Sequence, residues 1–90
     1  MKSILQDERI CRVCGSPYVE EHHVFGGSDR KNSTKYGLTV YLCHAHHNEP
    51  PNGVHFNAEM RKELQAWAQE EFERHYPELE FTDIFGKNYK

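Results

Sequence analysis

Apolar residues recur with a helical period in the C-terminal third of this chain and with a strand-like period near its middle. The helical stripe follows the i, i+4, i+7, i+8 and i+12 rows of one face and consists of Met60, Leu64, Trp67, Ala68 and Phe72. Asn57 is a suitable N-cap, and Pro77 prevents continuation, so a long helix is expected to end near residue 75 or 76. In a small domain this stripe is expected to pack in the core.

Two strands are predicted in the first half. Residues 38–42 are β-branched, aromatic and apolar on alternate positions, and they run directly into Cys43. Residues 18–25 form a second plausible strand, which ends at a pair of glycines. The segment between the strands, 26–36, is rich in Gly, Ser, Asn and charged residues and has no apolar period, so it is predicted to be an exposed loop.

Shorter elements complete the prediction. Residues 44–49 could form one or two helical turns before Pro50-Pro51-Asn52-Gly53 breaks the chain. Residues 82–86 are expected to form a single capped turn, with the aromatic residues of the tail folding back on the long helix. Together these elements predict one α+β domain over 1–90: a metal-binding core at 10–57, a helix at 57–76 and a tail at 77–90 that packs back.

Four metal-ligand residues indicate how so small a domain is held together. Two pairs, each separated by two residues and lying about thirty residues apart, have the spacing of two zinc knuckles that close on one tetrahedral ion: Cys11, Cys14, Cys43 and His46. A chain of 90 residues buries only about 60% of its unfolded surface, so a structural zinc would supply needed stability. His44 and His47 are close enough to compete for the fourth position, but His46 repeats the spacing of the first knuckle.

The histidines left over predict a second function. Six of the seven histidines fall within residues 22–55. Since adjacent residues on a strand point to opposite faces, the doublet His22-His23 suggests one metal ligand and one free base. His47, at the start of the next helix, can converge with the doublet on a divalent ion. A free imidazole with a pKa near 6.5 is well suited to take a proton from water, which together with a metal is the minimal equipment for phosphodiester hydrolysis.

The doublet, the strand and the run Leu42-Cys43-x2-His46-His47-Asn48 resemble the HNH (ββα-metal) nucleases, in particular small phage-type HNH proteins with a zinc knuckle pair. The resemblance covers about residues 10–57. It implies that His22 and His47 are ligands of a catalytic metal (Mg²⁺, Mn²⁺, Zn²⁺ or Ni²⁺), that His23 is the general base, and that His55 supplies a further ligand or a phosphate contact.

The chain departs from the family pattern at one position. The middle asparagine, which holds the loop over the catalytic histidine, should fall near Gly37 or Leu38, and neither offers an amide side chain. Asn32 lies too early and Asn48 too late to replace it. In the Gly-rich loop, Arg30 and Lys31 are candidate phosphate contacts or, equally, solubilising charges.

Charge and cysteine content set further expectations. The formal net charge is −3, which is unusual for a protein that binds nucleic acid, although bound metal ions would add positive charge locally. Three cysteines cannot pair evenly and no leader opens the chain, so a reduced, intracellular (cytoplasmic) protein is predicted. No apolar run approaches the roughly 20 residues needed to cross a membrane.

The function expected from these observations is a metal-dependent endonuclease that hydrolyses DNA and, as the family does, leaves 5′-phosphate and 3′-hydroxyl ends. Such a protein would cut with little specificity, prefer a DNA structure, or depend on a protein partner for targeting. The alternative is a non-catalytic zinc-binding module that recognises nucleic acid or a protein partner. A third interpretation is a purely structural zinc protein whose extra histidines bind metal adventitiously.

Overall fold

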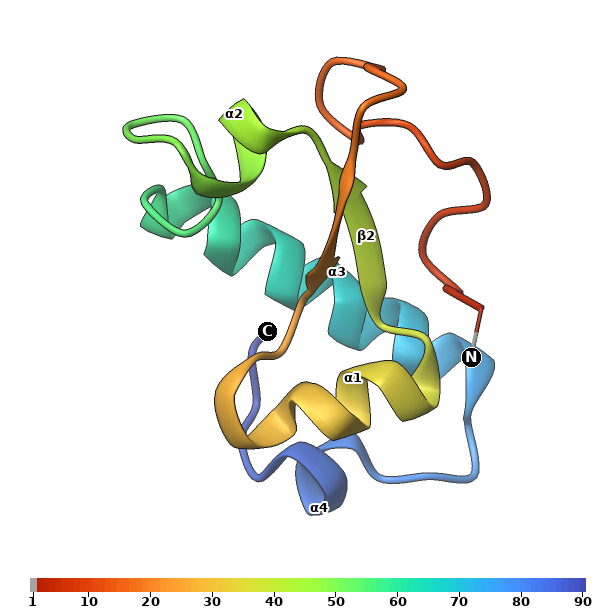
Figure 1. The fold of residues 1–90 in the computed structure, drawn as a ribbon. Helices are drawn as coiled ribbons and strands as arrows, with labels where there is room; N and C mark the ends of the chain where they lie inside the picture. The colour runs from red at the N-terminus through yellow and green to blue at the C-terminus, as the bar shows by residue number, and fades with distance from the viewer. Residues whose placement is uncertain (1) are drawn as a thin grey trace.

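A computed structural model describes residues 2–90 as a small α+β protein with one two-stranded antiparallel sheet (Figure 1). The elements follow one another as β1 (Glu20–His23), the 3-10 turn η1 (Gly27–Asp29), α1 (Arg30–Tyr36), β2 (Thr39–Leu42), α2 (His44–Asn48), α3 (Ala58–His75) and α4 (Phe81–Phe85). In Figure 1, α3 crosses behind the sheet, α2 lies at one end of the strands, and α1 and α4 lie at the other end.

The sheet brings residues from the two halves of the metal-binding segment together. In its register Glu20 pairs with Leu42 and His22 with Val40. Val40 and Leu42 are fully buried toward the core. Because β2 stops at Leu42 and α2 starts two residues later, Glu20 lies beside the start of α2.

β1 is shorter than the predicted strand over 18–25. Cys43 leaves the sheet and caps α2, so the residues that precede Glu20 have no partner strand. Tyr18 is therefore 84% exposed, and its backbone N–H is bound by the hydroxyl of Ser16 (3.2 Å). At the other end, Val24 N donates to Leu38 O (3.1 Å), which continues the pairing by one bond.

The long helix forms as its periodicity predicts. The side chain of Asn57 accepts a hydrogen bond from Met60 N (3.0 Å), which satisfies one of the free N–H groups of the first turn. Leu64, Ala68 and Phe72 are buried. Trp67 of the predicted stripe is only partly buried, and the Arg12 guanidinium lies 4.0 Å from the centre of its ring.

The tail folds back on α3, as the sequence also predicts. The ring of Phe72 lies 5.3 Å from Phe81 and 6.0 Å from Phe85, measured between centroids. Tyr89 N donates to the side-chain oxygen of Gln69 (2.7 Å), which fixes the last residues against the helix. The C-terminal tail is thereby held beside the segment that follows β1 (Figure 1).

The prediction of a loop over 26–36 is wrong, because this segment forms η1 and α1, although most of its residues are exposed as predicted. It lacks an apolar period, but it is anchored by hydrogen bonds. The hydroxyl of Ser33 is fully buried, donates to Phe25 O (2.7 Å) and accepts from Phe25 N (3.1 Å). Gly37 ends α1 in the left-handed conformation (φ +73°), which favours glycine.

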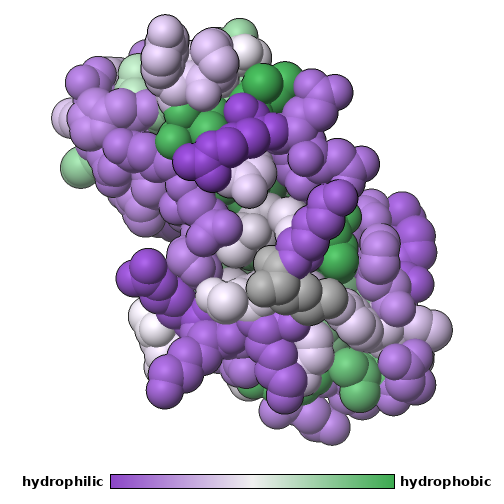
Figure 2. Space-filling view, turned by 45° about the vertical axis from the view of Figure 1, so that its right-hand side comes forward, coloured by the Kyte–Doolittle hydropathy of each residue, from purple (hydrophilic) through white to green (hydrophobic). Residues whose placement is uncertain are grey.

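On the face shown in Figure 2, hydrophilic residues cover most of the area and apolar residues form separate small patches. Among residues 2–90, no helix combines the length and the apolarity needed to span a membrane.

We expect Ser33→Ala to lower the free energy of unfolding by about 1–3 kcal/mol, because it leaves the buried N–H and C=O of Phe25 without their partner. Urea denaturation at saturating zinc measures the change, and exposed Ser28→Ala is the matched control. Equal midpoints for the two variants would contradict the account of how α1 is anchored.

Candidate metal centres

The first group of candidate ligands, here called the cysteine cluster, consists of three cysteines and one histidine whose ligand atoms all lie within 4.8 Å of one another: Cys11, Cys14, Cys43 and His46. The Sγ atoms of Cys14 and Cys43 are 3.7 Å apart, and His46 Nδ1 is 3.2 Å from Cys43 Sγ. Ligand atoms of a tetrahedral site with zinc–sulfur bonds of about 2.3 Å lie roughly 3.8 Å apart. The geometry of the cysteine cluster is therefore compatible with a structural zinc ion.

The local structure favours the ionised form of one ligand of the cysteine cluster, Cys11. Burial tends to raise the pKa of Cys11, but hydrogen bonds from backbone N–H groups, that of Cys43 foremost, lower it to about 6. A thiol with this pKa is largely ionised at neutral pH, and the thiolate is the form that binds metal. Gly15 follows Cys14 with φ +77°, a left-handed conformation that favours glycine and gives the first knuckle a tight turn.

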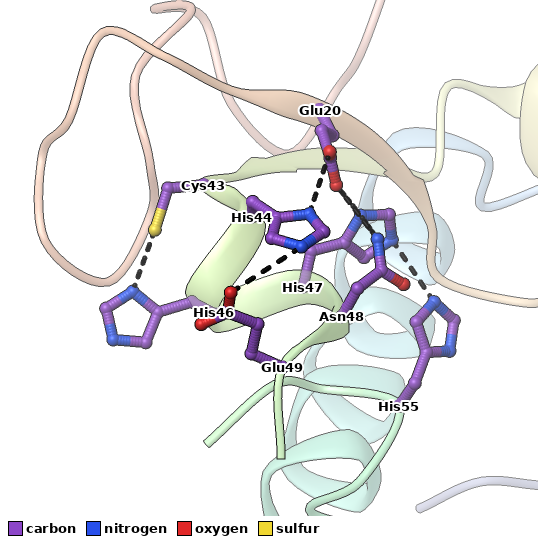
Figure 3. A network of polar contacts seen from close by, with 8 residues as sticks. All are labelled: Glu20, Cys43, His44, His46, His47, Asn48, Glu49 and His55. Atoms are coloured by element: carbon purple, nitrogen blue, oxygen red, sulfur yellow. Dashed lines mark hydrogen bonds and ion pairs between the residues drawn. The ribbon is translucent and has the colours of Figure 1, made fainter. Parts of the chain in front are cut away.

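The second helix separates the two groups of ligands. Figure 3 shows His46 pointing toward Cys43 on one side of α2, while His47 lies on the other side near Glu20 and His55. His44, the remaining competitor for the zinc, is exposed and pairs with the carboxylates of Glu20 (3.2 Å) and Glu49 (3.7 Å). His44 therefore belongs to neither group.

The second group, here called the histidine cluster, consists of His22, His47 and His55, whose ring nitrogens also lie within 4.8 Å of one another and could hold a metal ion. Nε2 of His47 is 3.2 Å from Nε2 of His55. The ring of His22 lies 5.1 Å from each of the other two, edge-on. Burial, followed by the charges of His47 and His55, lowers the pKa of His22 to about 3, so this imidazole is neutral at physiological pH.

One atom of the histidine cluster has no partner in the protein. Within residues 2–90, Nε2 of His22 is the buried side-chain nitrogen or oxygen for which no hydrogen bond is found. Leaving a buried polar atom unsatisfied costs about 1–3 kcal/mol. This nitrogen, next to two further imidazoles, has the chemistry of a metal ligand.

His55 reaches the cluster through a tight return of the chain. The loop after α2 turns at Gly53, whose N–H donates to Glu49 O, and Val54 N then donates to His46 O (2.8 Å). A Cβ on Gly53 would lie 2.8 Å from the backbone of Glu49, so no other residue fits. Val54 is completely buried and anchors the return.

Glu20 was not identified from the sequence and is central to this arrangement. Its Oε1 accepts hydrogen bonds from His47 Nδ1 (2.7 Å) and Asn48 Nδ2 (2.9 Å), and its Oε2 lies 3.2 Å from His44 Nδ1 (Figure 3). The bonds from His47 and His44 lower the pKa of Glu20, so it is ionised. With Nδ1 of His47 donating to this carboxylate, its Nε2 keeps the lone pair that a metal requires.

His23 points to different neighbours from those of His22, as expected for adjacent strand residues. Its Nε2 is 3.1 Å from Thr34 Oγ1, and that hydroxyl donates to Arg30 O (3.2 Å). Because the hydroxyl has one hydrogen, Nε2 of His23 must be the donor, and its Nδ1 then carries the free lone pair. Burial and the charge of Arg30 lower the pKa of His23, although Glu21 opposes this effect.

A pocket of about 280 Å³ lies over these residues. It is lined by the histidine cluster and by His23, Glu21 and Arg30, together with the two glycines that follow β1. Lys31 lines an adjoining hollow with Arg30 and Thr34. The structure therefore brings Arg30 to the pocket, whereas Lys31 lines only the adjoining hollow.

Comparison of this chain with protein-family models, with curated proteins and with solved structures finds no match.

We expect His46→Ala to remove a ligand of the structural zinc and unfold the domain, since structural zinc contributes on the order of 10 kcal/mol in small modules. Circular dichroism with and without chelator measures this loss. His44→Ala, two residues away but outside both clusters, is the matched control and should melt as the parent does. A folded, chelator-insensitive His46→Ala variant would exclude the zinc.

Proposed function

We propose that this protein is a metal-dependent endonuclease of the HNH type that hydrolyses DNA phosphodiester bonds. In this proposal β1, β2 and α2 form the ββα-metal unit, and the cysteine cluster holds the structural zinc that stabilises it. His22, His47 and His55 bind a catalytic divalent ion, and His23 is the general base.

The observation that carries the proposal is the buried Nε2 of His22, which has no partner within the described chain and lies beside two further imidazoles. A zinc module that only binds a partner needs the cysteine cluster and has no use for this second set. A divalent ion would satisfy all three nitrogens. Nitrogens bound tetrahedrally at about 2.0–2.1 Å lie roughly 3.3 Å apart, close to the 3.2 Å between His47 and His55.

The remaining residues suit the reaction. When bound at the histidine cluster, a divalent ion polarises a phosphate oxygen and stabilises charge on the leaving oxygen. His23 shares the pocket but not the cluster, so its free Nδ1 is available to take a proton from the attacking water. Arg30 at the pocket edge, and Lys31 beside it, supply positive charge for the phosphates on either side.

Thr34 and Gly37 account for the missing middle asparagine. A Cβ at Gly37 would lie 2.6 Å from Lys2 O, so this position cannot carry an amide side chain. The orientation of the base that an asparagine would provide is instead given by the hydroxyl of Thr34, at 3.1 Å from His23 Nε2. If the hydroxyl of Thr34 does not support turnover in place of the asparagine, the alternative function applies. The protein would then be a non-catalytic module that binds nucleic acid or a protein.

We expect His23→Ala to reduce plasmid nicking by about 10²–10⁴-fold while both metals stay bound, because the change removes the base and no ligand. Nicking with Mg²⁺ or Mn²⁺ is followed by gel electrophoresis, and metal content is measured on the same preparation. His75→Ala, an exposed histidine in the last turn of α3, is the matched control and should nick at the parental rate. If His23→Ala also nicks at that rate, the nuclease proposal fails and the binding-module function is favoured.

We expect Glu20→Ala to weaken metal binding at the histidine cluster by about 10–100-fold, because it removes the carboxylate that orients His47. Calorimetric titration of protein that already contains the structural zinc measures the affinity. Glu49→Ala removes a carboxylate that contacts His44 but not His47, and it should leave the titration unchanged. Equal affinities in the two variants would show that Glu20 has no part in the site.

A further inference from the structure

A second, basic hollow of about 520 Å³ lies between α3 and the C-terminal tail. Four cationic side chains line it: Arg61, Lys62, Lys87 and Lys90. Apart from Tyr89, the other lining residues are amides. This concentration of positive charge stands out in a chain whose formal net charge is −3.

Most of this charge is not neutralised within the protein. Lys90 pairs with Glu73 (Nζ to Oε1, 2.6 Å). In the part of the chain that the structure describes, no ion pair involves Arg61, Lys62 or Lys87. These three cations therefore have no carboxylate to neutralise them, although Arg61 bonds backbone carbonyls and Lys87 lies over the ring of Tyr89.

The basic hollow adjoins the histidine cluster. Arg61 Nη1 donates to Val54 O (3.3 Å) and lies 3.5 Å from His55 O, so its guanidinium is next to a residue of the cluster. Arg30 lines the pocket that the histidine cluster also lines. The C-terminal tail is held in place, because the ring of Tyr89 lies 4.8 Å from that of Phe25. Cations of the basic hollow and of the pocket therefore both lie close to the histidine cluster.

We propose that the first turns of α3 and the C-terminal tail form a second phosphate-binding surface, which holds the backbone of duplex DNA where it extends beyond the cleavage site. This inference rests on the proposed nuclease function. Duplex DNA carries one phosphate per about 3.4 Å of axis on each strand, so a duplex bound at the pocket presents further phosphates to the hollow that adjoins it. The ring of Tyr89 packs on Phe25, and the rest of the hollow presents charged and amide groups, which suits a polyanion better than a peptide with apolar anchors.

The surface also accounts for how an acidic protein could bind DNA. Residues 58–90 contain eight acidic and five basic residues. Three of the five basic residues line the hollow without a carboxylate partner: Arg61, Lys62 and Lys87. The positive charges are thus gathered in a hollow next to the pocket. There they attract DNA phosphates although the net charge of the chain is negative.

The test measures binding of a fluorescent DNA duplex by anisotropy over a series of salt concentrations. All variants are made in zinc-loaded protein that carries His23→Ala, so that the duplex is not cut. We expect Lys62→Ala/Lys87→Ala to lower the slope of log affinity against log salt by about 2, since each lost phosphate contact removes about 1. The charge-conserving Lys62→Arg/Lys87→Arg variant should keep the parental slope.

The matched control is Lys35→Ala/Arg74→Ala, which removes the same charge from the last turns of α1 and α3. An equal effect of the control and the test variant would overturn the surface, because net charge alone would then explain binding. Absence of any salt-dependent binding would also overturn it. A third outcome would overturn it as well: binding of a polyglutamate peptide that depends on Lys62 and Lys87, together with duplex binding that does not depend on them.

The salt dependence of duplex binding tests the basic surface, and plasmid nicking tests the nuclease activity, so either proposal can fail without the other. Nicking by the parent protein with an unchanged slope in the Lys62/Lys87 variant would retain the nuclease and reject the surface. A lowered slope without nicking by the parent would retain the surface and reject catalysis.

Discussion

The short helix α2 is the constraint on which both clusters of candidate ligands depend. It begins directly after Cys43, which leaves β2 and caps the helix, and it is only five residues long. Its adjacent residues His46 and His47 project to different sides, one toward the sulfur atoms and one toward the other imidazoles (Figure 3). A zinc ion that binds Cys43 and His46 would fix the orientation of α2, and with it the position of His47. Folding and the candidate chemistry are thereby coupled through a single helical turn.

Glu20 extends this coupling to the sheet. Glu20 is the first residue of β1 and lies opposite Leu42 in the register. Its charge-assisted hydrogen bonds with His47 and Asn48 hold the start of β1 against α2. Two residues farther along β1, His22 enters the histidine cluster from the buried side. The same strand therefore supplies both a candidate ligand and the carboxylate that orients another one.

Much of this arrangement could be predicted from local sequence signals, whereas the rest depends on tertiary contacts. The Cys-x2-Cys and Cys-x2-His spacings identify the cysteine cluster because a tetrahedral ion requires such knuckles, and the apolar period identifies α3. By contrast, α1 has no apolar stripe, and it is anchored by the hydrogen bonds between its one buried residue, Ser33, and Phe25. Glu20 carries no signal until the register places it beside α2. The basic hollow exists only because the tail packs against α3.

The central claim is that one chain builds two separate metal sites on the two sides of α2. Anomalous diffraction at the zinc edge, from crystals grown with excess zinc, tests it most directly. We predict two peaks per chain, one among the three cysteines and His46 and one among His22, His47 and His55. A single peak at the cysteines, with the three imidazoles bound to water or to one another, would contradict the account.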